Sequence, residues 1–206
     1  YLSEKFQALP KEGYTALFKR MVDHPNITLR LGTDYRDVLN DYSYRRLVYT
    51  GMIDEFFGYK FGRLPYRSLK FKPEYHKKEF YQPAMQVNYP NNHAYTRIVE
   101  IKHATGQKCK GTTIVKEYPQ DYKEGREAYY PIPMAESQAL YERYRAVAEL
   151  FADRVSFIGR LATYRYYNMD QIVGMALAEF EKIKTLEENT LEKKRFSGLD
   201  LIAVNQ

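Results

Sequence analysis

Apolar residues recur along the chain with two periods, one typical of helices and one typical of strands. Apolar positions three and four residues apart predict helices over residues 14–22, 137–152 and 169–183. Alternating or continuous short apolar runs predict strands over residues 27–31, 47–50, 66–72, 84–89, 95–103, 111–118 and 155–158. Helices and strands in this order predict a mixed α/β fold of the α+β type.

The predicted strands between residues 66 and 118 follow one another without an intervening helix. Turn-forming residues separate the last three of them, at residues 90–92 and 105–107. This arrangement predicts an antiparallel sheet, with one face packed and the other lining a site.

The passage from the strand at 155–158 into the last helix combines groups that favour anionic oxygens. Arg160 supplies a guanidinium, the following loop carries three tyrosines, and the helix N-terminus has free N–H groups. Asn168 is the predicted N-cap, and Asp170 in the first turn suits the helix dipole. Each charge-assisted hydrogen bond contributes about 1.5–3 kcal/mol, so three or four of them suffice to hold a diphosphate. The alternative is a strand, loop and helix whose aromatic residues only pack.

Composition narrows the class of protein but not its function. The chain has 206 residues, 44% of them hydrophobic and 28% charged, which is typical of a soluble globular protein. No apolar run approaches the length of a membrane span. Cys109 is the single cysteine, which excludes an internal disulfide and favours a reducing cytoplasm. The four histidines are scattered and predict no metal site.

Charge and tyrosine content leave two ligand classes open. The net charge of +6 suits an acidic ligand such as a nucleotide sugar, and it suits nucleic acid equally well. The 21 tyrosines, in a chain without tryptophan, are mostly expected to be half-buried packing residues.

Seven sequence blocks together resemble one enzyme family. They are LPKEGYTAL (9–17), VYTGMID (48–54), YRSLKF (66–71), AYTRIVE (94–100), TIVKEYP (113–119), AYYP (128–131) and the segment 155–172. In this order they resemble UDP-galactopyranose mutase, a flavoenzyme, from Tyr1 to about Lys184. The family begins with a G-x-G-x-x-G strand–turn–helix unit, and no such spacing occurs among the eleven glycines. The chain is therefore interpreted as the C-terminal half of a mutase, without the half that binds the FAD pyrophosphate.

The resemblance implies an isomerase that interconverts UDP-galactopyranose and UDP-galactofuranose for cell-surface polysaccharide synthesis. Reduced FAD would act as nucleophile through flavin N5, so no side chain is the catalytic nucleophile. The implied fold is that of amine-oxidase-like FAD-binding flavoproteins. Residues 1–57 and 153–185 would be pieces of the FAD domain, residues 58–152 the substrate-binding sheet with its following helix, and residues 186–206 a tail. By itself the chain is expected to be inactive and to bind no FAD tightly.

Family roles carry over to matching positions. Arg97 corresponds to a substrate-contacting arginine beside the flavin, although the pattern alone favours an outward strand arginine. Tyr130 and Tyr166 correspond to tyrosines that donate to the UDP diphosphate. Two further substrate-binding residues would be Tyr1 and Asn88.

The resemblance also implies contacts with the flavin. Gly159 and Arg160 would lie at the flavin, and Met169 would offer its backbone N–H to the flavin pyrimidine oxygen, where the helix dipole favours negative charge. Asn168 stands where an aspartate is common, so a role that needs a carboxylate is in doubt.

The same residues leave two other functions open and imply possible partners of the chain. One alternative is a related amine-oxidase-like flavin oxidoreductase, and another is a non-enzymatic basic nucleic-acid-binding module. The implied partner is the missing flavin-binding half, and a homo-oligomer is possible. The apolar faces of residues 14–50 and 155–183 are expected to be partly uncovered in this chain.

Overall fold

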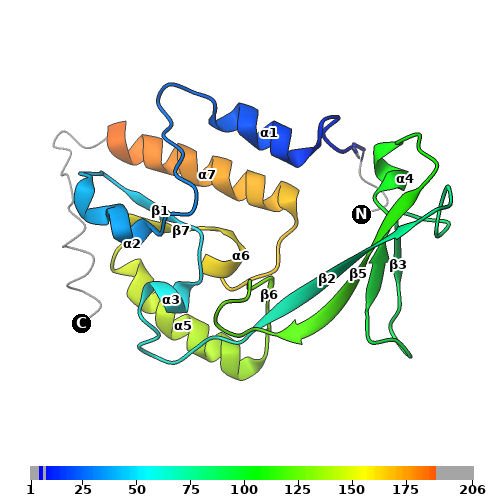
Figure 1. Cartoon of the computed structure of the whole chain (residues 1–206). Helices are drawn as coiled ribbons and strands as arrows, with labels where there is room; N and C mark the ends of the chain where they lie inside the picture. The colour runs from blue at the N-terminus through cyan, green and yellow to red at the C-terminus, as the bar shows by residue number, and fades with distance from the viewer. Residues whose placement is uncertain (1–4, 7, 189–206) are drawn as a thin grey trace. The chain divides into compact units, whose positions relative to one another are not determined.

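The computed structural model describes residues 5–6 and 8–188 (Figure 1). These residues form two compact units. The first unit lies within Tyr1–Gly32 and Leu69–Pro119, and the second within Thr33–Ser68 and Gln120–Gln206. Both units contain helices and strands, so the predicted mixed α/β class is confirmed. The predicted domain boundaries stay a prediction.

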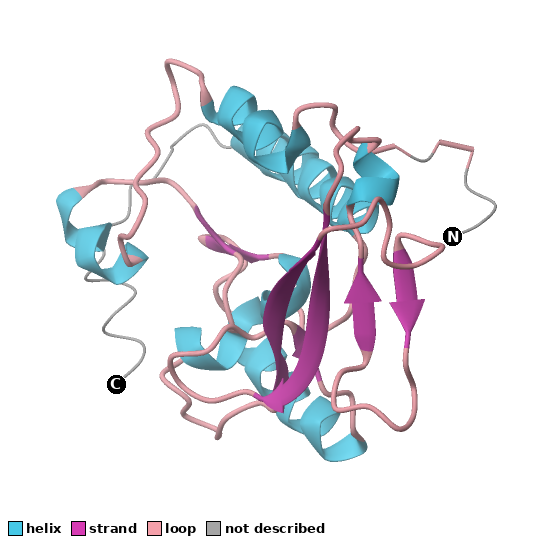
Figure 2. Ribbon diagram, turned by 45° about the vertical axis from the view of Figure 1, so that its right-hand side comes forward, coloured by secondary structure: helices cyan, strands magenta, loops and turns pink. Residues whose placement is uncertain are grey.

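The main sheet has five strands in the order β3-β4-β5-β2-β6, drawn in magenta in Figure 2. In that order the strands are Gln86–Asn88, Arg97–Val99, Thr112–Asp121, Tyr66–His76 and Tyr130–Pro131. The pairs β3 with β4, β4 with β5 and β2 with β6 are antiparallel. The predicted antiparallel sheet is therefore confirmed, and β2 runs on beyond its predicted end at residue 72.

In the first unit, helix α1 (Gly13–Val22) confirms the predicted helix at 14–22. The predicted strand at 27–31 is wrong. Residues 27–30 have irregular backbone, and Ile27, Leu29 and Leu31 are 47%, 57% and 82% exposed. A strand is stabilised by its ladder of hydrogen bonds and by burial of one face, and apolar alternation alone supplies neither.

The predicted strand at 95–103 is only half correct. Strand β4 ends at Val99, and helix α4 (Lys102–Thr105) follows after two residues. Gly106 ends this helix in a left-handed conformation with φ of 64°, and its N–H donates to the Lys102 carbonyl oxygen. Glycine adopts this conformation without a steric penalty, so it can end the short helix that replaces the second half of the predicted strand.

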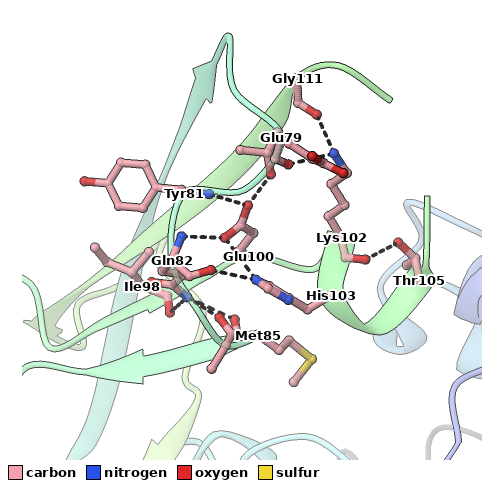
Figure 3. Close-up of polar contacts among 12 residues, drawn as sticks. Glu79, Tyr81, Gln82, Met85, Ile98, Glu100, Lys102, His103, Thr105 and Gly111 are labelled. Atoms are coloured by element: carbon pink, nitrogen blue, oxygen red, sulfur yellow. Dashed lines mark hydrogen bonds and ion pairs between the residues drawn. The ribbon is translucent and has the colours of Figure 1, made fainter. Parts of the chain in front are cut away.

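A buried polar cluster holds the chain around β4 and α4 together (Figure 3). The Glu100 carboxylate is fully buried and accepts hydrogen bonds from the Tyr81 N–H at 2.8 Å, the Gln82 N–H at 2.9 Å and the Thr112 hydroxyl at 2.6 Å. Lys102 is 4% exposed, and its ammonium donates to three carbonyl oxygens, those of Glu79, Cys109 and Gly111. Tyr81, Gln82, Glu100, Lys102 and Thr112 are called the Glu100 cluster below.

The second unit contains a two-stranded parallel sheet and most of the helices. Strands β1 (Leu47–Tyr49) and β7 (Val155–Phe157) pair in parallel, which confirms both predicted strands. The helices are α2 (Tyr35–Val38), the 3-10 helix η1 (Leu39–Asp41), α3 (Ile53–Phe56), α5 (Ala135–Glu149), α6 (Gly159–Ala162) and α7 (Met169–Glu188). Helices α5 and α7 confirm predictions, whereas α6 forms where the sequence predicts a loop.

Aromatic residues dominate the core of the second unit. Phe57 and Tyr144 are among its least exposed side chains, and their ring centroids lie 6.1 Å apart. The Tyr144 hydroxyl accepts from the Phe61 N–H at 3.0 Å and donates to the Gly62 carbonyl oxygen at 2.7 Å. Tyrosine thus fills this core while its polar end is hydrogen-bonded, which explains part of the high tyrosine content.

Helix α7 presents two different faces. Glu179 accepts from the Ser156 hydroxyl on β7, and Met175 accepts from the Gly159 N–H through its sulfur at 3.2 Å. Val173, Leu177 and Phe180, on another face, are 58%, 62% and 58% exposed. The predicted exposure of apolar residues is therefore present on this helix.

Candidate functional site

Tyr130 and Tyr166 form a stacked ring pair in the second unit. Their centroids are 5.7 Å apart and the ring planes differ by 27°. Tyr130 lies on β6, where it pairs with Arg67 of β2, and Tyr166 lies in the loop between α6 and α7. The fold thus brings together two tyrosines that the sequence analysis assigned to one ligand.

Arg160 of α6 lies against both rings. Its guanidinium carbon is 4.6 Å from the Tyr166 centroid and 5.5 Å from the Tyr130 centroid. Its Nε donates to the Tyr167 carbonyl oxygen at 2.8 Å, and its Nη2 donates to the same oxygen. Each cation–π contact contributes about 0.5–1 kcal/mol at an exposed position. Tyr130, Arg160 and Tyr166 are called the tyrosine–arginine cluster below.

The phenol hydroxyls of this cluster are available to a ligand. Among residues 5–6 and 8–188, neither the Tyr130 nor the Tyr166 hydroxyl has a hydrogen-bond partner. Tyr166 is 54% exposed. Exposed phenol donors beside a guanidinium favour the binding of anionic oxygens.

A cavity of about 780 Å³ adjoins Tyr166 on the side of α5. Its lining includes Arg165 and Arg145, and it has the size of a small-molecule site. Arg145 is paired with Glu142 at 2.7 Å, whereas the Arg165 guanidinium lies 5.4 Å from the Tyr167 ring centroid. The charge of Arg145 is thus partly neutralised, and Arg165 contributes most of the positive charge of this lining.

Arg97 lies on β4 in the first unit and is held by two polar side chains. Its Nε donates to Asn88 Oδ1 at 3.1 Å, across the pair that β3 and β4 form at these two residues. Its Nη1 lies 3.5 Å from a carboxylate oxygen of Glu117, which faces it from β5. The arginine is therefore oriented by its neighbours, unlike a freely solvated strand arginine.

Sequence reasoning missed Glu117. The residue lies in the TIVKEYP block, but its role depends on the register that places it opposite Arg97. A register is set by pairing between strands, so the pattern of a single strand does not reveal it.

The structure distributes the predicted substrate residues between the two units. It brings Tyr130 and Tyr166 together in the second unit, and Arg97 and Asn88 together in the first. Tyr1 lies outside the described residues.

The start of α7 matches the predicted N-cap. The Asn168 carbonyl oxygen accepts from the Ile172 N–H at 3.1 Å, and the Asn168 N–H donates to Gln171 Oε1 at 2.8 Å. The first of these is the first backbone bond of the helix, and the second is one half of a capping box, whose Gln171 partner the sequence analysis missed. Met169 opens the helix and is 54% exposed. The first N–H groups of such a helix lack partners within the helix, and its dipole favours negative charge there.

Helix α6 begins and ends with residues in the left-handed region. Gly159 starts it with φ of 89°, which accounts for glycine at this position. Tyr164 follows its end with φ of 46°, and the Arg165 N–H donates to the Arg160 carbonyl oxygen at 3.1 Å. This is the Schellman pattern, in which glycine usually occupies the position of Tyr164. A residue other than glycine costs roughly 1–3 kcal/mol there.

The described part of the chain contains neither a cluster of metal ligands nor a membrane-spanning helix. No three His, Cys, Asp or Glu side chains gather there to hold a metal ion. Over the same residues, no helix combines the length and the apolar composition that crossing a membrane requires.

Comparisons with known proteins identify relatives. The family model of UDP-galactopyranose mutase matches residues 1–166. The chain is 33% identical over 184 residues to a dTDP-fucopyranose mutase of Escherichia coli, covering 86% of this chain and 48% of that protein. It is 34% identical over 199 residues to a probable UDP-galactopyranose mutase of Klebsiella pneumoniae, with coverages of 96% and 51%. It is 36% identical over 192 residues to the UDP-galactopyranose mutase of Mycoplasma pneumoniae, with coverages of 86% and 48%.

The extent of these matches supports a firm assignment to a family. The chain spans about half the length of the curated relatives it matches. The matched residues include Arg97, Arg160 and both members of the tyrosine pair. Because the match extends over most of this sequence, the chain belongs to the UDP-galactopyranose mutase family.

Proposed function

We propose that the chain is the C-terminal, substrate-binding portion of a flavin-dependent UDP-galactopyranose mutase. The whole enzyme would interconvert UDP-galactopyranose and UDP-galactofuranose in the cytoplasm for cell-surface polysaccharide synthesis. Family membership supports an isomerase acting on a nucleotide sugar. The observation that carries the proposal is the tyrosine–arginine cluster, whose two phenol donors and guanidinium suit a diphosphate.

In this proposal each polar side chain has a separate task. Tyr130 and Tyr166 donate to the diphosphate and hold the leaving group in place. Arg97 is proposed as a substrate contact, with its guanidinium oriented by Asn88 and Glu117. A positive charge held in place stabilises the negative charge that develops on the departing UDP. Tyr1 is proposed as a further substrate contact.

The residues present fit one end of FAD and not the other. The first N–H groups of α7 have no partner within the helix and lie at the positive end of its dipole, which suits the anionic ring of a reduced flavin. No G-x-G-x-x-G sequence is present to hold the pyrophosphate. We assign Gly159, Arg160, Asn168 and Met169 to the ring end. When bound in its reduced form, FAD supplies the nucleophile of the reaction.

The remaining part of the flavin site would come from a region outside this chain. The relatives are about twice as long as this chain. Strands β1 and β7 form a parallel pair alone, whereas parallel strands usually lie inside larger sheets with both faces covered. We infer that a region with the G-x-G-x-x-G unit completes an amine-oxidase-like flavoprotein fold here. The chain by itself would then be inactive and bind FAD weakly.

The test is an isomerase assay on the full-length protein. UDP-galactofuranose is incubated with enzyme whose flavin is either oxidised or reduced with dithionite, and the products are separated by chromatography. UDP-galactopyranose should form only with the reduced enzyme. Turnover with oxidised flavin and no reductant would contradict the proposal.

The substrate is tested in the same assay. Because one relative is a dTDP-fucopyranose mutase, dTDP-fucopyranose serves as the competing substrate. The proposal expects a higher kcat/KM for the UDP-sugar. A higher value for the dTDP-sugar would keep the reaction type and change the substrate.

Two other functions have their own measurements. Oxygen consumption linked to substrate oxidation would favour the amine-oxidase-like oxidoreductase. Nucleic-acid binding that weakens steeply with salt would favour the basic binding module. The proposal expects neither result.

A further inference from the structure

Tyr164 occupies a position at which glycine is usual. It follows the end of α6 in the left-handed conformation, with φ of 46°. Its side chain is only 3% exposed, so the ring lies in the interior and not at the surface. A bulky residue keeps such a conformation only where the surrounding structure fixes it.

The surroundings of Tyr164 fix it through its hydroxyl and its ring. The hydroxyl lies 2.7 Å from the Pro65 carbonyl oxygen and 3.0 Å from the Ile132 carbonyl oxygen, and it donates its hydrogen between them. The ring stacks on Tyr141 with centroids 5.8 Å apart and meets Tyr66 edge-on at 5.3 Å. The Ile132 N–H also donates to the Pro65 oxygen, so Tyr164 contacts the end of the β2–β6 ladder.

The two segments that Tyr164 joins carry the two stacked tyrosines. Tyr130 lies on β6, two residues before Ile132, and Tyr166 lies two residues after Tyr164. We propose that Tyr164 is a positioning residue, which fixes the loop between α6 and α7 so that Tyr166 stacks on Tyr130. Both phenols are then held in place before the diphosphate binds, and less conformational freedom is lost on binding. The identity of the ligand as a diphosphate rests on the proposed function, whereas the ordering of the loop by Tyr164 does not.

A purely structural role makes a different prediction. If Tyr164 only packs in the core, loss of its hydroxyl lowers the unfolding free energy but leaves ligand affinity unchanged in the folded protein. If it positions Tyr166, loss of the hydroxyl weakens ligand binding under conditions where the protein remains folded.

The first test measures binding of UDP to the full-length protein by calorimetry. Tyr164→Phe keeps the ring and removes the hydroxyl, and we expect UDP to bind about 3- to 10-fold more weakly. Tyr164→Gly suits the turn but removes the ring, and we expect a loss of more than about tenfold. Tyr141→Phe is the matched control, because the Tyr141 hydroxyl has no hydrogen-bond partner among the described residues. Its affinity should change less than about twofold.

Kinetics separate positioning from a general loss of active enzyme. We expect Tyr164→Phe to raise KM with a nearly unchanged kcat, because saturating substrate reorders the loop. A fall in kcat as large as the fall in kcat/KM, with an unchanged KM, would overturn the inference.

The second test reads the loop without any ligand. A fluorotyrosine at position 166 gives one 19F NMR signal, which stacking on Tyr130 shifts away from that of the free amino acid. Both Tyr164 variants should move this signal toward the free value, and the Tyr141 control should not. An unchanged signal in Tyr164→Phe would overturn the inference, whatever happens to affinity. If the wild type binds no UDP but its signal responds to Tyr164, the positioning role stands and the proposed function fails.

Discussion

The Glu100 cluster and the tyrosine–arginine cluster combine similar groups in opposite ways. In the Glu100 cluster a buried carboxylate accepts two backbone N–H groups and a hydroxyl, and a buried ammonium is surrounded by three carbonyl oxygens. In the tyrosine–arginine cluster two phenol hydroxyls have no partner in the described part of the chain, and Tyr166 is half exposed. Arg160 contacts both of these rings.

The difference distinguishes groups that hold the fold from groups that bind a ligand. A buried charge whose hydrogen bonds are all made contributes to stability and has no donor or acceptor left for a ligand. An exposed donor without a partner contributes little to stability and remains free to bind. We therefore expect substitutions in the Glu100 cluster to change stability, and substitutions in the tyrosine–arginine cluster to change ligand binding.

The largest effect is expected at Glu100. In Glu100→Ala the N–H groups of Tyr81 and Gln82 and the Thr112 hydroxyl lose a charged acceptor while they remain buried. The unfolding free energy, measured with urea, should fall by about 3–5 kcal/mol. Glu79→Ala is the control, because the side chain of Glu79 is exposed in the same segment. The comparison would be contradicted if the unfolding free energy changed by more than about 1 kcal/mol in Glu79→Ala, or by less than that in Glu100→Ala.

The next effect is expected at Arg97, whose Nε and Nη1 contact Asn88 and Glu117. Arg97→Ala removes a proposed substrate contact, so kcat/KM of the full-length protein should fall by about a hundredfold. Arg126→Ala removes an exposed arginine with one backbone contact and should leave kcat/KM unchanged. If the Arg97 variant has the kcat/KM of the wild type, Arg97 is not part of the substrate site.

A smaller effect distinguishes tyrosines whose hydroxyl has no partner from a buried tyrosine whose hydroxyl is hydrogen-bonded. Tyr130→Phe and Tyr166→Phe each remove a phenol donor without a partner, so UDP affinity should fall about tenfold and the unfolding free energy should change by less than about 0.5 kcal/mol. Tyr144→Phe removes a buried hydroxyl with two hydrogen bonds. It should lower the unfolding free energy by about 1–2 kcal/mol and leave UDP affinity unchanged. Calorimetry and urea unfolding on all three variants measure both effects.

The smallest effect concerns pH. Burial raises the pKa of Glu100, but the hydrogen bonds from Thr112, Tyr81 and Gln82 outweigh it and lower the pKa below its ordinary value. A lowered pKa in the folded state gives stability that is present above the unfolded pKa of about 4.3 and is lost as pH falls through the folded pKa. The difference in unfolding free energy between the wild type and Glu100→Gln, measured by urea titration, should therefore become smaller below about pH 5. A difference that widens with acid would show that the pKa is raised.

Helices and strands could be predicted from the sequence where a periodic apolar pattern also has another element to pack against or pair with. In helices α5 and α7 the apolar periodicity extends over many residues, and β1 and β7 are apolar runs that pair with each other. The alternation at Ile27, Leu29 and Leu31 has the same local pattern but no ladder, and the strand does not form. Helix α6 is only four residues long, which is too short for a period to show.

The residues of the candidate site were predicted mainly from the family resemblance, but their supporting contacts were not. The resemblance singled out Arg97, Tyr130 and Tyr166 from the sequence. Glu117 and Tyr164 depend on strand register and on a left-handed turn, and neither leaves a pattern in the local sequence. Sequence therefore predicted which groups could bind a ligand, and the structure was needed to find the residues that hold them.

The most direct test of the account is a crystal structure of the full-length protein with UDP bound. The account predicts that the Tyr130 and Tyr166 hydroxyls lie within roughly 2.5–3.0 Å of diphosphate oxygens and that Arg97 reaches the same ligand. Well-ordered UDP bound away from these tyrosines, or Arg97 directed to a surface without ligand, would contradict it.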